Sequence, residues 1–308
     1  MESQEKTKIT KSFLLQMAAL LGLWWVAVTS VLMVLLGITP TKLYVSMGVM
    51  ERPCKGYNGC FSFCNVGNGD GSCVYTDKVF GVIDFGTAEY ANSFCDKAVA
   101  IREKPWDFAV ISHPHLDHIG GYEVFLKTIG LKRLFIRAYT PDQLADYALY
   151  QNILTLSAEY GVEVIHPTDG TVATAGEITL DFYSLNFDTD DENERCLLTR
   201  ATIGGHSCLF VGDSGFANEA YLLHHGYDVD ADLLKVGHHG SKNATSPDFL
   251  AAVSPHTAII CVGYNRYDHP SAETTTLLSE NNIDFYRTDL QNQLVFSVDK
   301  NELVLNPI

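Results

Sequence analysis

The chain has 308 residues and a formal net charge of -16 at pH 7. A surface this acidic repels polyanions, which argues against passive nucleic-acid binding, because that function requires a basic face. The length and the 46% content of hydrophobic residues are enough to bury the core of one large globular domain or two small ones.

The N-terminal region carries a long apolar run. Residues 12–41 contain no charged side chain, and the stretch 13–38 is almost entirely apolar. Because a bilayer core requires about 20 such residues, the run predicts one uncleaved transmembrane helix at residues 12–41. The basic residues on the two sides of the run are nearly balanced, with Lys6, Lys8 and Lys11 before it and Lys42, Arg52 and Lys55 after it, but the three lysines of the short tail at residues 1–11 favour a cytoplasmic N-terminus. We therefore expect a single-pass protein of the cell membrane with an extracellular domain.

Residues 42–59 contain Pro53, Gly56 and Gly59 and are predicted to be a linker, so the folded domain is predicted at residues 60–308. The chain has eight cysteines, and five of them crowd just beyond the apolar run, where some could pair in an oxidising compartment. Cys208 and Cys261 lie within apolar runs and are predicted to be buried thiols.

The domain is predicted to alternate short apolar strands with helices. Two strands are expected around the turn "GNGDG" within residues 61–75, and two more within residues 283–299. The other expected strands are residues 79–84, 108–113, 134–139, 162–167, 178–185, 196–203, 208–213, 231–239 and 257–264. Helices are expected at residues 91–102, 141–160, 218–225, 247–253 and 272–281. Strands clustered in this way favour an α/β sandwich, in which helices cover two β-layers.

Four predicted strands end at residues that suit a metal site. Asp84 ends "VIDFG", Asp213 ends "LFVGD", and His238 and His239 end "LLKVGHH". The segment "ISHPHLDHIGG" at residues 111–121 follows another strand and holds four possible ligands within six residues. Polar residues at strand ends can converge on one edge of a sheet, so the pattern predicts a binuclear metal pocket.

The spacing within this segment suggests how two ions could be shared. In a nearly extended chain His113 and His115 point the same way and can bind one ion. The chain then turns, so that Asp117 and His118 can face a second ion, and Asp213 is the candidate bridge. Imidazole and carboxylate ligands suit two Zn²⁺ ions, with Mn²⁺ as the alternative.

The segment "SHPHLDHIGG" resembles the H-x-H-x-D-H signature of the metallo-β-lactamase fold family, and the resemblance extends from residue 61 to the C-terminus. Within that family, "NVGNGDGSCV", "FVGDSG", "LLKVGHHGS" and "VGYNRYDHP" are similar to segments of the C-terminal domain of the DNA-uptake protein ComEC. The resemblance implies an αββα metallo-β-lactamase-type sandwich with a two-metal hydrolase site, preceded here by the predicted transmembrane helix.

The resemblance also implies a function for individual residues. The implied metal ligands are His113, His115, Asp117, His118, Asp213 and His239, and the choice between His238 and His239 as the last ligand stays open. Asp84 resembles a carboxylate that orients the ligand loops. The groups expected to face substrate or to take part in catalysis are His238, His269 and Asp117.

The chain departs from the wider family at one ligand. Many members have a further histidine before the bridging aspartate, but "NERCLLTRATIGGHSCLFVGD" has none at its strand start, and His206 lies in an expected turn. ComEC-like sequences also lack this histidine. The first metal site is therefore expected to be weaker or open.

We predict a membrane-anchored, metal-dependent hydrolase, a phosphodiesterase that acts on nucleic acid or on a cell-surface phospho-polymer. Binding of nucleic acid would then depend on the metals and on lysines such as Lys235 and Lys242. The alternatives are a phosphorylcholine esterase of a surface polymer, a lactonase or β-lactamase-like hydrolase, and a non-catalytic, metal-stabilised binding module. The sequence indicates no protein partner.

Overall fold

The computed structural model describes residues 13, 16–31, 56–102, 104–187, 189, 191–299 and 302–306. The chain forms two compact units, Met1–Glu51 and Arg52–Ile308. In the first unit residues 16–31 are helical, and most of their large apolar side chains are exposed. Across the described ranges, every helix is too short or too polar to cross a bilayer. Much of the predicted span at residues 12–41, and most of the predicted linker, lie outside the described residues.

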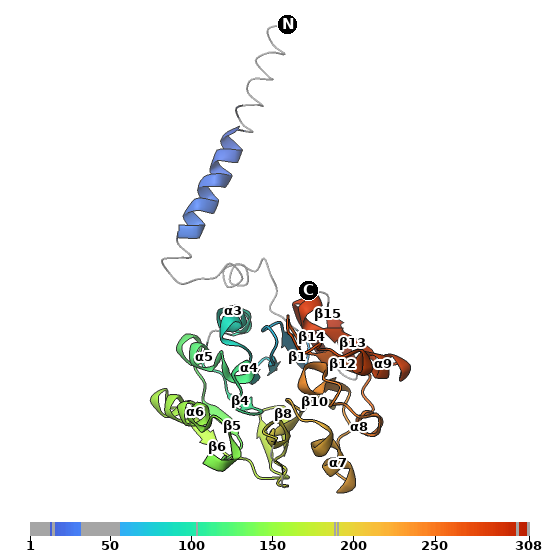
Figure 1. The fold of residues 1–308 in the computed structure, drawn as a ribbon. Helices are drawn as coiled ribbons and strands as arrows, with labels where there is room; N and C mark the ends of the chain where they lie inside the picture. Colours follow the sequence, from blue (N-terminus) through green and yellow to red (C-terminus); the bar gives the residue numbers. More distant parts are fainter. Residues whose placement is uncertain are drawn as a thin grey trace, which may run out of the picture. The chain divides into compact units, whose positions relative to one another are not determined.

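The second unit contains two β-sheets between two layers of helices (Figure 1). The first sheet has the order β15-β14-β1-β2-β3-β4-β5-β6. Its strands are β1 (Gly59–Cys64), β2 (Gly71–Tyr75), β3 (Phe80–Phe85), β4 (Phe108–Ile111), β5 (Arg133–Ile136), β6 (Glu163–Ile165), β14 (Gln293–Asp299) and β15 (Glu302–Asn306). The second sheet has the order β13-β12-β11-β10-β9-β8-β7. Its strands are β7 (Val172–Ala175), β8 (Ile178–Tyr183), β9 (Leu198–Ile203), β10 (His206–Phe210), β11 (Leu233–Lys235), β12 (Thr257–Ile260) and β13 (Asp284–Arg287).

Helices flank both sheets. The α-helices of this unit are α3 (Ala91–Ile101), α4 (Leu116–Ile119), α5 (Tyr122–Thr128), α6 (Tyr147–Glu159), α7 (Phe216–His224), α8 (Pro247–Val253), α9 (Ala272–Glu280) and α10 (Thr288–Gln291). Short 3₁₀ helices are η1 (Ala88–Tyr90), η2 (Pro141–Gln143), η3 (Asn193–Arg195) and η4 (Gly237–Gly240). One helix was predicted over residues 141–160, but the structure has η2 and α6 there. The two are separate because Leu144 between them has an extended backbone.

Three apolar clusters hold the layers together. One lies between the sheets, where Phe63 of β1 stacks on Phe210 of β10 with ring centroids 5.8 Å apart. A second packs α3, α5 and α6 against the first sheet, and a third packs α7, α8 and α9 against the second. Burial of this much apolar surface is the main stabilising term of the domain. The four layers confirm the predicted sandwich.

Each sheet has a parallel part, and these parts position the site. Strands β3 to β6 run parallel in the first sheet, and β10 to β13 run parallel in the second. In open α/β sheets, ligands bind at the carboxyl ends of such strands. The segments that carry the predicted ligands follow the carboxyl ends of β4, β10 and β11.

The cysteines of the described residues are buried. Cys208 and Cys261 are free thiols in the cluster between the sheets, as predicted. Cys60 is disulfide-bonded. Of the other cysteines in the predicted crowded group, Cys64, Cys73 and Cys95 are free thiols, and Cys54 lies outside the described residues.

Candidate metal centre

Four of the predicted ligands form one compact cluster. A ligand atom from each of Asp117, His118, Asp213 and His239 lies within 4.8 Å of the others. The Nε2 atom of His239 is 3.2 Å from Oδ2 of Asp117 and 3.4 Å from Oδ2 of Asp213. The Nε2 atom of His118 is 3.3 Å from Oδ1 of Asp213. Asp117 and His118 lie in α4, which follows β4 of the first sheet. Asp213 and His239 follow β10 and β11 of the second sheet.

The cluster has the properties of a cation site. The atoms His113 Nε2, His118 Nε2 and Asp213 Oδ1 are buried, and none of them makes a hydrogen bond of good geometry with another described residue, although His118 Nε2 and Asp213 Oδ1 lie 3.3 Å apart. Buried polar atoms are rarely left in this state unless they bind water or an ion. Imidazole nitrogens and carboxylate oxygens are ligands that suit Zn²⁺ and Mn²⁺. The residues present therefore fit a divalent metal.

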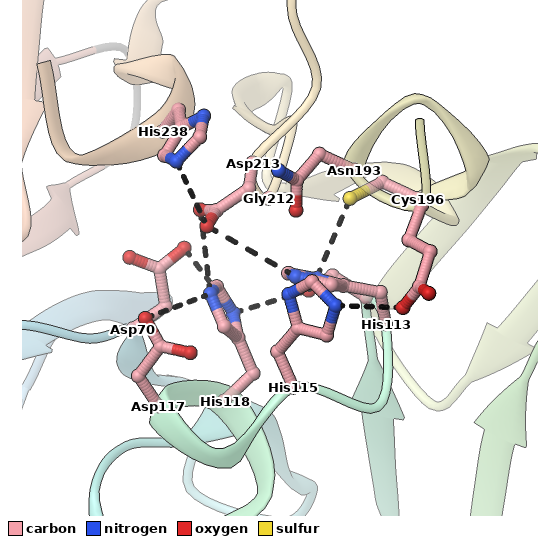
Figure 2. A network of polar contacts seen from close by, with 12 residues as sticks. Asp70, His113, His115, Asp117, His118, Asn193, Cys196, Gly212, Asp213 and His238 are labelled. Atoms are coloured by element: carbon pink, nitrogen blue, oxygen red, sulfur yellow. Dashed lines mark hydrogen bonds and ion pairs between the residues drawn. The ribbon is translucent and has the colours of Figure 1, made fainter. Parts of the chain in front are cut away.

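The two histidines that were predicted to share the first ion lie in different environments (Figure 2). The Nε2 atom of His113 is 4.0 Å from Oδ2 of Asp213, at the border of the cluster. The Nε2 atom of His115 is instead 3.0 Å from Oε2 of Glu192, and His115 does not join the cluster. Cys196, from the segment that lacks the further histidine, places its Sγ 3.4 Å from Nδ1 of His113. The structure thus brings the second set of predicted ligands together more completely than the first.

Asp84 fixes the orientation of His118. Its Oδ2 atom is 2.9 Å from Nδ1 of His118 and accepts a 2.7 Å hydrogen bond from the Ser112 hydroxyl, while its Oδ1 accepts a 2.8 Å bond from the Ser112 amide. Asp84 has a left-handed backbone (φ 57°), which a non-glycine residue adopts only when its surroundings hold it. By binding Nδ1, the carboxylate directs Nε2 of His118 into the cluster.

Two further residues support the cluster and were not predicted to do so. The ammonium group of Lys235 forms an ion pair with Asp70 and donates a 2.9 Å hydrogen bond to the carbonyl oxygen of Gly212. Asp70 in turn lies 3.4 Å from Nδ1 of His239 through its Oδ1. A lysine inside the apolar run "LLKV" is a signal for such a pair, because a buried charge requires a partner.

The expectation that Lys235 would help to bind nucleic acid is wrong. Only 1% of its surface is exposed, and its charge is already paired with Asp70. The exposed Lys242, by contrast, lines the cavity described below.

The ionisable side chains of the cluster shift one another's pKa values. Burial disfavours the charged form of His118, but the carboxylates of Asp213 and Asp84 outweigh this effect and raise its pKa well above the ordinary value. Burial would raise the pKa of Asp213, but His239 and His118 lower it well below its usual range. Burial lowers the pKa of His113, which has weaker carboxylate contacts. The carboxylates therefore favour positive charge at the centre of the cluster.

A polar cavity of about 630 Å³ opens from the cluster. The two histidines predicted to face substrate, His238 and His269, line it, and their ring centroids are 5.5 Å apart. His239, rather than His238, enters the cluster, and its Nδ1 is 2.8 Å from the carbonyl oxygen of Cys261. His238 and His239 both have left-handed backbones, with φ of 45° and 53°, a conformation that is strained for residues other than glycine. With this backbone, His239 enters the cluster while His238 lines the cavity.

The chain is similar to known proteins in both sequence and fold. Residues 74–264 match the Metallo-beta-lactamase superfamily. The chain is 30% identical over 282 residues to ComE operon protein 3 of Bacillus subtilis, an alignment that covers 84% of this chain and 35% of that protein. It is 35% identical over 113 residues to Competence protein ComA of Neisseria gonorrhoeae, covering 36% of this chain and 16% of that protein. The chain therefore spans only about a third of the length of the first of these relatives.

Solved structures share the fold. The metallo-beta-lactamase fold protein YhfI from Bacillus subtilis superposes with a TM-score of 0.53 and 16% identity, covering 77% of this chain and 98% of YhfI. CmlA, a diiron beta-hydroxylase from Streptomyces venezuelae, superposes with a TM-score of 0.55 and 12% identity, covering 78% of this chain and 54% of CmlA.

Proposed function

Because this chain belongs to the metallo-beta-lactamase superfamily, we propose that it is a metal-dependent phosphodiesterase of the nuclease-like, ComEC type. The observation that carries the proposal is the buried cluster of Asp117, His118, Asp213 and His239, which opens into a polar cavity. A relative named as a competence protein supports a nucleic-acid substrate in preference to a cell-surface phospho-polymer.

The lining of the cavity supports a phosphoryl substrate. Donor groups from Asn68, Ser241 and Lys242 line it, together with the imidazoles of His238 and His269 and the carboxylates of Asp268 and Glu273. The donor groups can bind the charged oxygens of a phosphodiester.

Each part of the site has a distinct task in this proposal. When bound, divalent metal supplies Lewis-acid activation of the phosphoryl group and of water. Asp117, His118, Asp213 and His239 would hold it, with His113 at the border. His238 has its Nε2 3.8 Å from Oδ2 of Asp213, so it can donate a hydrogen bond to an oxygen next to the cluster. His269 lies farther out, where a leaving group would depart and take up a proton.

The proposal is tested with purified full-length protein supplied with Zn²⁺ or Mn²⁺ and bis(p-nitrophenyl) phosphate. We expect turnover that EDTA abolishes and that Asp213→Asn reduces to background. Asp232→Asn is the matched control, because Asp232 accepts a 2.8 Å hydrogen bond from the Ser207 amide outside the cluster. Absence of turnover in protein with demonstrated metal content would contradict the proposal. Hydrolysis of p-nitrophenyl phosphorylcholine or of a lactone instead would support one of the alternative activities.

We also propose that the uncharged stretch at residues 13–38 anchors the protein in the cell membrane, with the catalytic domain outside. The exposed apolar side chains of the described helix at residues 16–31 support this proposal. An anchored protein stays in the membrane fraction after alkaline carbonate extraction, and protease added to intact cells removes its domain. Release by carbonate would contradict anchoring.

A further inference from the structure

Two tyrosines next to the cavity are unusually exposed. Tyr264 and Tyr267 have 95% and 75% of their surface exposed, more than any other large hydrophobic side chain of the described residues. Tyr267 lines the cavity, and Tyr264 lies three residues before it on the same loop. Single exposed aromatic residues are common on protein surfaces, but the loop that carries these two is held in place by a side chain of its own.

The loop is fixed by the side chain of Asn265. Its Nδ2 donates to the carbonyl oxygens of Gly263 (2.9 Å) and His269 (2.8 Å). Its Oδ1 accepts from the amides of Tyr267 (3.0 Å) and His269 (3.1 Å). The start of the loop is also packed closely, because a Cβ atom added to Gly263 would lie 2.4 Å from the carbonyl carbon of Gly67. The tyrosines are therefore presented on an ordered frame, which lowers the entropy cost of binding a ligand on them.

A row of rings connects this loop with the metal cluster. The centroid of Tyr267 is 5.8 Å from that of His269, which is 5.5 Å from that of His238. His238 is in turn 6.1 Å from His239 of the cluster. A polymer whose reacting bond lies at the cluster and whose chain follows this row would bring its neighbouring groups to Tyr267, with Tyr264 three residues before it on the same loop.

We infer that Tyr264 and Tyr267 form a stacking platform for the bases of a single-stranded nucleic acid whose phosphodiester lies at the cluster. The inference rests on the proposed phosphodiesterase function and identifies its substrate. Stacking requires a free face on each base, which a single strand offers and a duplex covers. Stacking also supplies affinity that does not depend on charge, which matters for a protein with a net charge of -16.

The groups around the platform are of mixed charge. The exposed Arg266 lies between the two tyrosines in sequence and Lys242 lines the cavity with Tyr267, and Asp268 and Glu273 line it as well. The two cations can bind the phosphates of a nucleotide. Recognition of choline uses an enclosed aromatic cage, whereas both tyrosines are open to solvent, which favours a nucleotide over a choline group.

The test compares two substrates that differ only in their bases. The full-length metal-loaded protein is given a short oligothymidylate and an oligomer of equal length made of abasic tetrahydrofuran units. In the double variant Tyr264→Leu/Tyr267→Leu, we expect kcat/KM for oligothymidylate to fall by about ten-fold or more, and kcat/KM for the abasic oligomer to stay unchanged. Tyr264→Phe/Tyr267→Phe keeps the rings and should retain activity. Tyr160→Leu, at an exposed tyrosine after α6, controls for loss of a surface ring.

Equal losses on both oligomers, or no loss on either, would overturn the platform while leaving the phosphodiesterase proposal intact. If the wild-type protein cleaves neither oligomer, the nucleic-acid substrate of the proposed function fails, and hydrolysis of bis(p-nitrophenyl) phosphate shows whether phosphodiesterase activity remains. Fluorescence anisotropy then measures the binding of labelled oligomers in EDTA, which tests the role of the tyrosines without any cleavage. Weaker binding of oligothymidylate alone in the leucine variant supports the platform, and equal binding by both proteins contradicts it.

Discussion

Lys235 lies in β11 with 1% of its surface exposed, although lysine is seldom buried. Burial lowers its pKa, but the carboxylates of Asp70 and Asp213 outweigh this effect and raise it. We expect Lys235→Met to reduce the free energy of unfolding by about 3–5 kcal/mol, because Asp70 would remain as an uncompensated buried charge. Urea denaturation of both proteins measures the difference.

Two further variants separate charge from packing at this position. Lys242→Met removes an exposed lysine of the cavity and should change the free energy of unfolding by no more than about 0.5 kcal/mol. Asp70→Leu combined with Lys235→Met removes both charges and should recover part of the lost stability. If Lys235→Met alone is as stable as the wild type, the ion pair does not stabilise the fold.

Asp84, which was predicted to orient the ligand loops, contacts His118 and Ser112. Asp84→Asn keeps the shape of the side chain but removes the charge that orients the imidazole. We expect the affinity for Zn²⁺ to fall by about 10–100-fold, measured by competition with a chromogenic chelator.

Asp107→Asn is the matched control for this prediction. Like Asp84, Asp107 accepts a hydrogen bond from a backbone amide, that of Phe80 at 3.0 Å, but it is only partly buried and lies just before β4, beside the opposite end of β3. Its replacement should leave the metal affinity unchanged. Equal losses in both variants would mean that the effect of Asp84 is general destabilisation.

The sequence predicts some contacts between the residues of the site and not others. Asp117, His118, Asp213 and His239 come together because each follows a strand end that the apolar pattern already marks. The contact of His115 with Glu192 joins residues 77 positions apart, and no local pattern indicates it. The same holds for Asp70, whose partner Lys235 comes from the other sheet.

At the scale of elements, α7 has an unusual N-terminal cap. Buried Glu194 of η3 accepts hydrogen bonds from the amides of Gly215 (3.3 Å), Ala217 (3.2 Å) and Asn218 (2.9 Å) at the start of the helix. We expect Glu194→Ala to lower the free energy of unfolding by about 1–2 kcal/mol, because these amides lose their acceptor. The change should also weaken metal binding, since Asp213 lies only three residues before the first residue of the helix.

Thermal denaturation and metal titration check both effects of Glu194→Ala. Asp248→Ala provides the control, because Asp248 is an exposed acidic residue in the first turn of α8 and caps no amide group through a hydrogen bond in the described residues. A variant at Glu194 that loses stability but keeps full metal affinity would contradict the link between the cap and the site.

The elements that were predicted best have local signals. Helices α8 and α9 begin after Ser246 and Ser271, whose hydroxyls accept bonds from the amides of Phe249 and Thr274. Strands β7 and β15 were not predicted. Both are short, and they exist because each pairs with a neighbour, β8 and β14 respectively. The strand expected over residues 231–239 is reduced to β11, since the left-handed His238 and His239 end it early.

At the scale of the whole molecule, the net charge of -16 should reverse the usual salt effect on nucleic-acid substrates. A basic binding protein loses affinity steeply between about 50 and 200 mM salt. Here we expect kcat/KM for oligothymidylate to stay constant or to rise over the same range, because salt screens the repulsion. A small monoanionic diester serves as control and should show almost no change. A steep decline for the oligomer would indicate that local cations dominate binding.

Each sheet positions two of the four clustered ligands. Asp117 and His118 follow a strand of the first sheet, and Asp213 and His239 follow strands of the second. A metal bound by all four would fasten the two halves of the sandwich at this edge. At a concentration 100-fold above its dissociation constant, such an ion adds about 2.7 kcal/mol to stability. We expect EDTA to lower Tm and to hasten cleavage by trypsin, and the Asp213→Asn variant to show neither response. The supply of metal to a cell would then set the lifetime of this protein, and copies that never acquired their ion would be the first to be degraded.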